Sequence, residues 1–105
     1  MNRKDLVIAL ELKRRLSRIV SLIDLRVFGS RARGDSDEYS DMDVYVLVEN
    51  MDKDLKQRVR DIIWEVGFEN FIVISPLLFT KDEIENTAMR SSQIVRNIIE
   101  DGVRI

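Results

Sequence analysis

Residues 41–50, DMDVYVLVEN, constrain the fold of this chain more than any other segment. Their β-branched and aromatic side chains predict a strand. Side chains alternate between the two faces of a strand, so Asp41 and Asp43 point to the same side, opposite Met42 and Val44. Neighbouring like charges repel one another unless water screens them or a cation holds them. The segment therefore predicts either a solvated acidic pair or a cation site at one end of this strand.

Segments with helical periodicity flank this strand on both sides. Apolar residues recur at helical spacing over about residues 4–23 and again over residues 52–67, where Gly67 is the predicted C-cap. A last helix is expected to begin after Thr80, because Thr80 and Glu83 form a capping-box pattern. The apolar positions of the three predicted helices are Leu6, Leu10, Leu16, Ile19, Val20 and Ile23, then Leu55, Val59, Ile62, Ile63 and Val66, then Ile84, Ala88, Val95, Ile98 and Ile99.

Two further segments predict strands. The sequence DLRVFGS indicates a short buried strand that ends at Gly29, and residues 70–80, NFIVISPLLFT, indicate a third strand. Pro76 has no N–H to donate, so we expect the third strand to lie at a sheet edge or to be bulged or broken there. The order helix, strand, strand, helix, strand, helix predicts an α+β fold, in which helices flank a small mixed sheet and residues 1–105 form a single domain.

Composition narrows the chemistry that this chain can perform. It contains no cysteine and no histidine, so transfer chemistry must depend on carboxylates, hydroxyls, Lys, Arg and metal ions. A formal net charge of −2 argues against nucleic acid as a partner. No apolar run reaches the roughly 20 residues of a membrane helix, so we expect a cytoplasmic protein. A small core and an edge strand are compatible with self-association or with a hetero-complex.

Groups suited to binding an anion precede the acidic pair. Gly29 lets the backbone approach a phosphate closely, and Ser30 adds a hydroxyl at the start of a predicted helical turn. Arg31 and Arg33 add positive charge. Each feature alone has an ordinary explanation: a simple turn, surface arginines, a solvated acidic loop or an exposed Asp pair. Together, and in this order, they favour a site for a metal–nucleotide complex, with the acidic pair binding Mg²⁺.

Residues 29–49, GSRARGDSDEYSDMDVYVLVE, resemble the signature of the minimal nucleotidyltransferases, which are members of the DNA polymerase β-like superfamily. That signature runs from a strand through G-S and an R-x-R-G turn to a loop ending in S-D, followed by D-x-D on the next strand. The matching positions are Gly29, Ser30, Arg31, Arg33, Gly34, Ser40, Asp41 and Asp43.

The resemblance implies a palm-like mixed sheet and transfer of AMP from Mg–ATP to an acceptor hydroxyl. Asp41 and Asp43 would be the catalytic carboxylates and would bind two Mg²⁺ ions. The phosphates would be bound by Gly29, Ser30, Arg31 and Arg33. Relatives of this size are often antitoxins encoded beside a helical HEPN-type toxin, and some adenylylate a tyrosine of that partner. The resemblance therefore implies ATP as donor and a HEPN-type protein as partner in a hetero-complex.

One expected residue is absent from the signature. Active members of the superfamily usually carry a third carboxylate on the later strand, where this chain has Val73 or Ser75. Glu69 is the nearest acid, yet it precedes the strand and is expected to lie too early to reach the site. Two functions therefore stand: an adenylyltransferase acting on a toxin, or a catalytically weak or inactive nucleotide-binding module that acts by complex formation. We do not expect nucleotide addition to RNA or to an antibiotic, because these 105 residues predict no additional substrate-binding domain and their charge balance is acidic.

Overall fold

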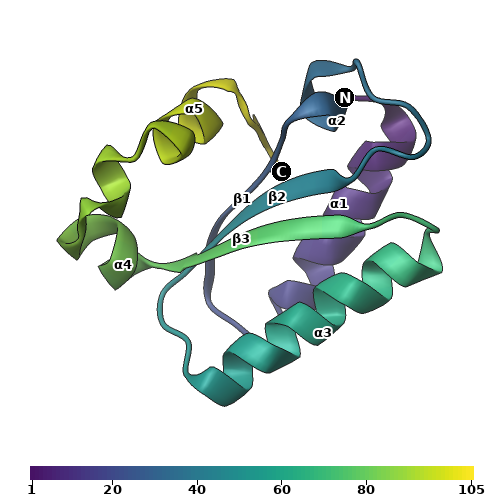
Figure 1. The fold of residues 1–105 in the computed structure, drawn as a ribbon. Helices are drawn as coiled ribbons and strands as arrows, with labels where there is room; N and C mark the ends of the chain where they lie inside the picture. Colours follow the sequence, from purple (N-terminus) through teal and green to yellow (C-terminus); the bar gives the residue numbers. More distant parts are fainter.

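A mixed four-stranded sheet organises the computed structural model, which describes residues 1–105 (Figure 1). The prediction of an α+β fold with a small mixed sheet is confirmed. No helix has the length and apolar character needed to cross a bilayer. In chain order the elements are α1 (Arg3–Leu16), β1 (Leu22–Phe28), α2 (Ser30–Arg33), β2 (Met42–Val48), α3 (Lys53–Glu69), β3 (Ile74–Thr80), α4 (Lys81–Asn86), the 3₁₀-helix η1 (Ala88–Ser91), α5 (Gln93–Asp101) and β4 (Val103–Arg104).

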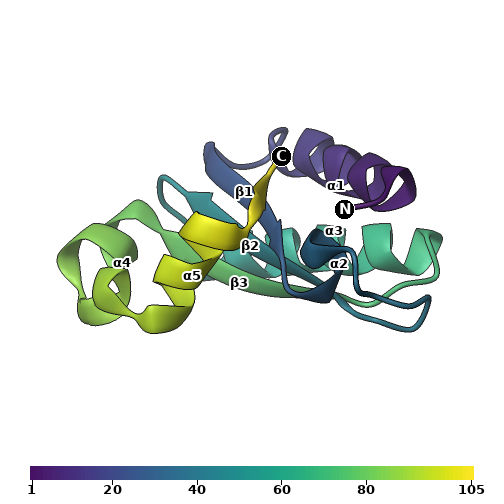
Figure 2. The same cartoon turned by 90° about the horizontal axis from the view of Figure 1, so that it is seen from above.

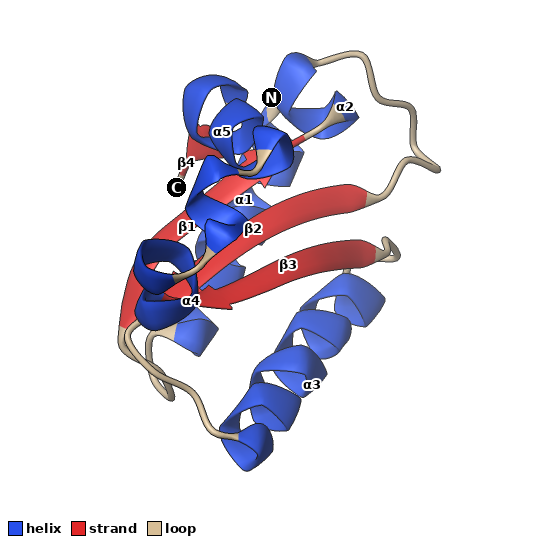
Figure 3. Cartoon of the chain, turned by 60° about the vertical axis from the view of Figure 1, so that its left-hand side comes forward, coloured by secondary structure: helices blue, strands red, loops and turns tan.

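The strands follow the order β3-β2-β1-β4 across the sheet (Figure 3). β1 pairs with β2 and with β4 in antiparallel orientation, whereas β2 and β3 are parallel. Parallel neighbours need a crossover connection, and α3 provides it. β3 lies at the edge of the sheet, as Pro76 predicted. The short strand β4 was not expected, because two residues carry no periodicity.

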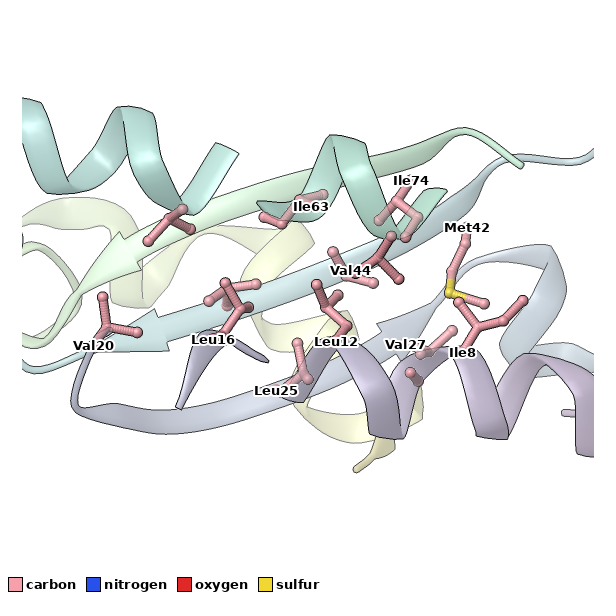
Figure 4. Close-up of a cluster of buried hydrophobic side chains, with 14 of the residues drawn as sticks. Ile8, Leu12, Leu16, Val20, Leu25, Val27, Met42, Val44, Ile63 and Ile74 are labelled. Carbon is pink, nitrogen blue, oxygen red and sulfur yellow. The ribbon is translucent and has the colours of Figure 1, made fainter. Parts of the chain in front are cut away.

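One face of the sheet is covered by α1 and α3, and the main hydrophobic core lies between these layers (Figure 4). Met42, Val44 and Val46 point from β2 into this core and are fully buried. From α1 the core receives Ile8, Leu12 and other residues of that face, and from α3 it receives Val59, Ile63 and Val66.

The predicted apolar face of the first helix was partly wrong. α1 ends at Leu16, and Ile23 belongs to β1. Leu6 and Leu10 are 39% and 48% exposed, whereas Leu12 is fully buried. Around a helix, Leu10 lies about 200° and Leu6 about 240° from Leu12, so neither shares a face with Leu12.

The opposite face of the sheet is partly covered by α5 (Figure 2). Val95 and Ile98 of α5 are buried outside the main core cluster. The single last helix of the prediction is interrupted, because Thr87 and Ser92 adopt extended backbone conformations. The Thr87 hydroxyl instead accepts a hydrogen bond from the Met89 N–H and caps η1. The predicted capping box between Thr80 and Glu83 is present at the start of α4.

Gly67 does not cap α3, contrary to the prediction. It lies inside the helix, which ends at Glu69 and is capped by Asn70. A Cβ on Gly67 would lie 2.7 Å from the Ile72 carbonyl oxygen. The glycine is needed because the chain entering β3 passes directly against this turn, where the Ile72 N–H donates to the Gly67 carbonyl at 3.0 Å.

Candidate active site

Gly29 and Asp43 touch at the end of the β1–β2 pair. Phe28, the last residue of β1, is the register partner of Asp43, so Gly29 follows directly beside that carboxylate. A Cβ at Gly29 would lie 2.5 Å from the Asp43 Oδ2. The backbone of Gly29 also has φ +75° and ψ −155°, a region that is essentially limited to glycine. Both space and backbone conformation therefore require glycine at this position.

The two aspartates of the D-x-D motif lie close enough to influence each other. Asp41 is exposed and directly precedes β2, and Asp43, the second residue of β2, is half-buried. Burial raises the pKa of the Asp43 carboxyl above its usual value, the charge of Asp41 raises this pKa further, and Arg33 partly offsets both. Neither aspartate takes part in any ion pair of the structure. The pair is therefore a concentration of negative charge that Arg33 offsets only in part.

The short helix α2 begins at Ser30 and presents its first turn next to these carboxylates. It closes when the Arg33 N–H donates to the Gly29 carbonyl at 3.1 Å, and Gly34 ends it with φ +82°. The first backbone N–H groups of a helix have no partner within the helix. Ser30 therefore adds a hydroxyl to a group of backbone donors near the aspartates.

Arg31 occupies a different position from the one that the sequence predicted. Its side chain is 6% exposed and donates to the Asp5 carboxylate at 2.7 Å. It also donates twice to the Ser40 carbonyl oxygen, at 3.0 and 2.7 Å. The guanidinium is held there because Asp5 is itself buried and needs a cationic partner. Arg31 thus connects α1 and α2 to the residue before Asp41, and its guanidinium is engaged in these buried contacts.

Asp5 is a residue that the sequence analysis missed. It lies on α1 at helical spacing from Ile8, Ala9 and Leu12, all of which are buried. An acid on an otherwise apolar helix face is a signal for a buried ion pair, and this signal was available in the sequence.

Arg33 is the available cation of the site. Its side chain is 63% exposed and forms an ion pair with Asp35 at 3.2 Å. It also lies near enough to Asp43 to lower the pKa of that carboxyl. An exposed pair of this kind is weak, so Arg33 can exchange Asp35 for a bound anion.

No third acid joins the aspartates. Ser75 of β3 is the register partner of Asp43 and stands where the third carboxylate is expected. The structure contains no group of three His, Cys, Asp or Glu side chains that could hold a metal ion. Glu69 is the last residue of α3 and forms an ion pair with Arg15 of α1 at 2.6 Å, so its side chain is held between the two helices. The sequence-based expectation that Glu69 does not reach the aspartates agrees with this position.

A cleft of about 500 Å³ opens beside Gly29, between α2 and α5. Gly29 and Arg33 line it on one side, and Asn97 and Asp101 of α5 line it on the other. The sequence analysis did not connect α5 with the site. Asn97 and Asp101 are polar residues one helical turn apart, but only the packing of α5 on the sheet brings them to Gly29.

Two solved structures have a similar fold. A crystal structure of a putative nucleotidyltransferase from Sulfolobus solfataricus superposes with a TM-score of 0.52 at 19% identity, covering 94% of this chain and 77% of that one. A crystal structure of a toxin–antitoxin with AMP-PNP superposes with a TM-score of 0.55 at 18% identity, covering 90% of this chain and 69% of that one. At these identities the likeness shows the fold alone.

Sequence relatives give a more specific result. The relative from Methanocaldococcus jannaschii named "Putative protein adenylyltransferase MJ0141" is 39% identical over 83 residues, which are 71% of this chain and 78% of the relative. A second relative from that organism, "Putative protein adenylyltransferase MJ1305", is 43% identical over 60 residues, which are 54% of this chain and 41% of the relative. The family described as "Nucleotidyltransferase domain" matches residues 9–105. With the fold and the Gly29–Asp43 arrangement, these matches show that the chain belongs to the nucleotidyltransferase domain family.

Proposed function

We propose that the protein transfers AMP from Mg–ATP to a hydroxyl group of another protein. The observation that carries this proposal is that Gly29, directly before helix α2, lies against the Asp43 carboxylate, which is one of two neighbouring carboxylates outside any ion pair. A metal–nucleotide complex needs both features in one place. The names of the two relatives from M. jannaschii, both protein adenylyltransferases, support AMP as the transferred group.

The donor set around Asp43 fits magnesium. Mg²⁺ is bound in proteins by one or two carboxylates and completes its shell with water and substrate phosphates. Asp41 and Asp43 would bind two Mg²⁺ ions when the nucleotide is present. When bound there, Mg²⁺ would supply neutralisation of the phosphate charge and polarisation of the α-phosphate. The Gly29 backbone and Ser30 would bind the β- and γ-phosphates, with Arg33 adding positive charge beside them.

The reaction is a substitution at the α-phosphorus of ATP. A bond forms between the acceptor oxygen and the α-phosphorus, and the bond from that phosphorus to the bridging oxygen of the β-phosphate breaks. Pyrophosphate leaves, and the proton of the acceptor hydroxyl passes to water, because Ser75 is not a base. The contribution of the protein is to position the reactants and to complement their charge.

We further propose that the acceptor hydroxyl belongs to a toxin partner of the HEPN type, in a hetero-complex in which this chain is the antitoxin. The support is that one structural neighbour is a toxin–antitoxin assembly holding AMP-PNP, a nucleotide analogue. A tyrosine of the partner would then receive AMP.

A second candidate function is favoured by one observation. Ser75 replaces the expected third carboxylate next to Asp43, and no other acid completes the group. A site with two carboxylates can bind Mg–nucleotide yet turn over slowly. In this alternative the protein neutralises its partner by forming a complex, and nucleotide binding supports that complex.

One experiment separates the two candidates. The protein is incubated with Mg²⁺, ATP labelled on the α-phosphate and a candidate helical partner of the HEPN type, with the double variant Asp41→Asn/Asp43→Asn as control. Label on the partner that disappears with the double variant supports AMP transfer. Tight complex formation without label on either protein would reject transfer in favour of the binding module.

A further inference from the structure

The cleft between α2 and α5 is continuous with the candidate active site. Gly29 forms part of its wall and lies against Asp43, so a nucleotide with its phosphates at Gly29 has the cleft directly adjacent. Its volume of about 500 Å³ is within the range of small-molecule sites. The cleft is therefore the space beside those phosphates in which a nucleoside attached to them could lie.

The walls of the cleft match the parts of a nucleoside. Phe28, Ala32, Ile94 and Ile98 provide apolar surface, which suits the faces of a base. The polar groups contributed by α5 are Asn97 and Asp101, which share one face because they are four positions apart. The cleft thus combines apolar walls with one amide and one carboxylate on α5 and with Arg33 on the opposite side.

Asn97 has hydrogen-bonding capacity left for a ligand. Its Oδ1 accepts one hydrogen bond, from the Gln93 Nε2 at 2.8 Å. An amide oxygen has two lone pairs and the amide nitrogen has two donors, so one acceptor and two donors remain. A side-chain amide with a free acceptor and a free donor matches N6 and N7 of adenine.

Asp101 is placed between the amide and the phosphate position. β4 pairs Val103 with Val27, which holds the end of α5 alongside the last residues of β1, just before Gly29. Asn97 lies one turn further from that end of the helix. The order Gly29, Asp101, Asn97 therefore follows the order phosphate, ribose, base. A carboxylate at the middle position can accept hydrogen bonds from ribose hydroxyls, and Asp101 is exposed and takes part in none of the ion pairs.

We propose that the cleft between α2 and α5 is the nucleoside subsite of this protein, in which Asp101 binds the ribose hydroxyls and Asn97 selects adenine. This assignment rests on the proposed binding of Mg–nucleotide at Gly29 and Asp43. It adds the specificity-determining residues, neither of which belongs to the G-S or D-x-D motifs.

Isothermal titration calorimetry tests the assignment: ligands that each lack or change one part of ATP are titrated into the full chain in the presence of Mg²⁺. The ligands are ATP, 2′-deoxy-ATP, 3′-deoxy-ATP, GTP and inorganic tripolyphosphate. Asp101→Ala should weaken ATP binding about 10- to 100-fold, the usual value of a hydrogen bond to a charged group, and should abolish the difference between ATP and at least one deoxy analogue. Asn97→Ala should reduce the preference for ATP over GTP by roughly tenfold. Neither substitution should change the affinity for tripolyphosphate.

Matched controls come from the same region of the chain. Glu100→Ala removes the neighbouring acid, which lines a separate cavity beside Tyr45, and Asn86→Ala removes an amide from α4. Both should bind ATP as the wild type does. If Asp101→Ala and Asn97→Ala also bind ATP as the wild type does, the subsite is wrong while the proposed function stands. If the wild type binds neither ATP nor tripolyphosphate, the proposed function and the subsite both fall.

Discussion

At the scale of single residues, Gly29 is the position with the least freedom. Gly34 provides a matched control, because its φ is also positive while a Cβ there would have nothing within 4 Å. Gly34→Ala should cost about 1 kcal/mol of unfolding free energy and leave Mg–ATP affinity unchanged. Gly29→Ala should cost more and should abolish measurable Mg–ATP binding, because the new Cβ displaces the Asp43 carboxylate. Urea unfolding and calorimetry measure both quantities, and a Gly29→Ala protein that binds like wild type would contradict the proposed phosphate position.

The raised pKa of Asp43 predicts how stability depends on pH. The folded protein holds this proton more tightly than the unfolded chain does, so the unfolding free energy falls as pH rises from the ordinary Asp pKa of 3.8 through the raised pKa of Asp43. Asp43→Asn should remove this loss and raise Tm at neutral pH. Added Mg²⁺ should raise the Tm of the wild type and leave Asp43→Asn unaffected. Thermal unfolding across pH, with and without Mg²⁺, measures this; equal Tm values for both proteins at neutral pH would oppose it.

Arg31 and Arg33 are two positions apart, yet the structure gives them opposite roles. Arg31→Ala leaves Asp5 buried without a cation and should lower the unfolding free energy by about 3 kcal/mol. Arg33→Ala should change it by less than about 0.5 kcal/mol, because that side chain is exposed, while weakening Mg–ATP binding. Denaturant titration and calorimetry on both variants test this division. The roles are wrongly assigned if Arg33→Ala is the less stable variant.

At the scale of elements, the pairing of β2 with β3 decides how many acids the site has. The register places Ser75 directly opposite Asp43, and the Ser75 side chain is exposed. Ser75→Asp should therefore add the third carboxylate, increase Mg²⁺ affinity and raise the rate of AMP transfer by roughly tenfold or more if the new acid acts as a base. Without Mg²⁺ the same change should lower Tm, because like charges directly opposite one another repel. Ser75→Asn is the control, and a Ser75→Asp protein with unchanged Mg²⁺ affinity would show that β3 does not face the metal position.

The elements differ in how far local sequence determined them. β2 was predicted well because its alternation is strong, and the start of α4 because a capping box is a local interaction. The predicted end of α3 was wrong because Gly67 is required for a close contact with Ile72, and hydrophobic periodicity contains no information about such a contact. The break between α4 and α5 was also missed, since apolar residues on both sides keep helical spacing while Thr87 and Ser92 are extended.

At the scale of the whole molecule, the helical layer holds Glu69 away from the active site. Glu69 pairs with Arg15 across α1 and α3, and its side chain is 52% exposed. Glu69→Gln should change the unfolding free energy by no more than about 1 kcal/mol, as expected for a surface pair. It should leave Mg–ATP affinity and AMP transfer unchanged, in contrast to Asp43→Asn. Loss of AMP transfer in Glu69→Gln would mean that this residue reaches the reacting groups after all.

The sequence by itself determined the α+β fold, the Gly29–Ser30 turn and the shared face of Asp41 and Asp43. These follow from local rules: alternation along a strand, helical spacing and the backbone freedom of glycine. Only the tertiary structure decided that Arg31 forms a buried ion pair with Asp5 and that α5 lines the cleft beside Gly29. The physical reason is that burial of a charge and packing of a distant helix depend on tertiary contacts. Residue spacing along the chain does not predict which segments make those contacts.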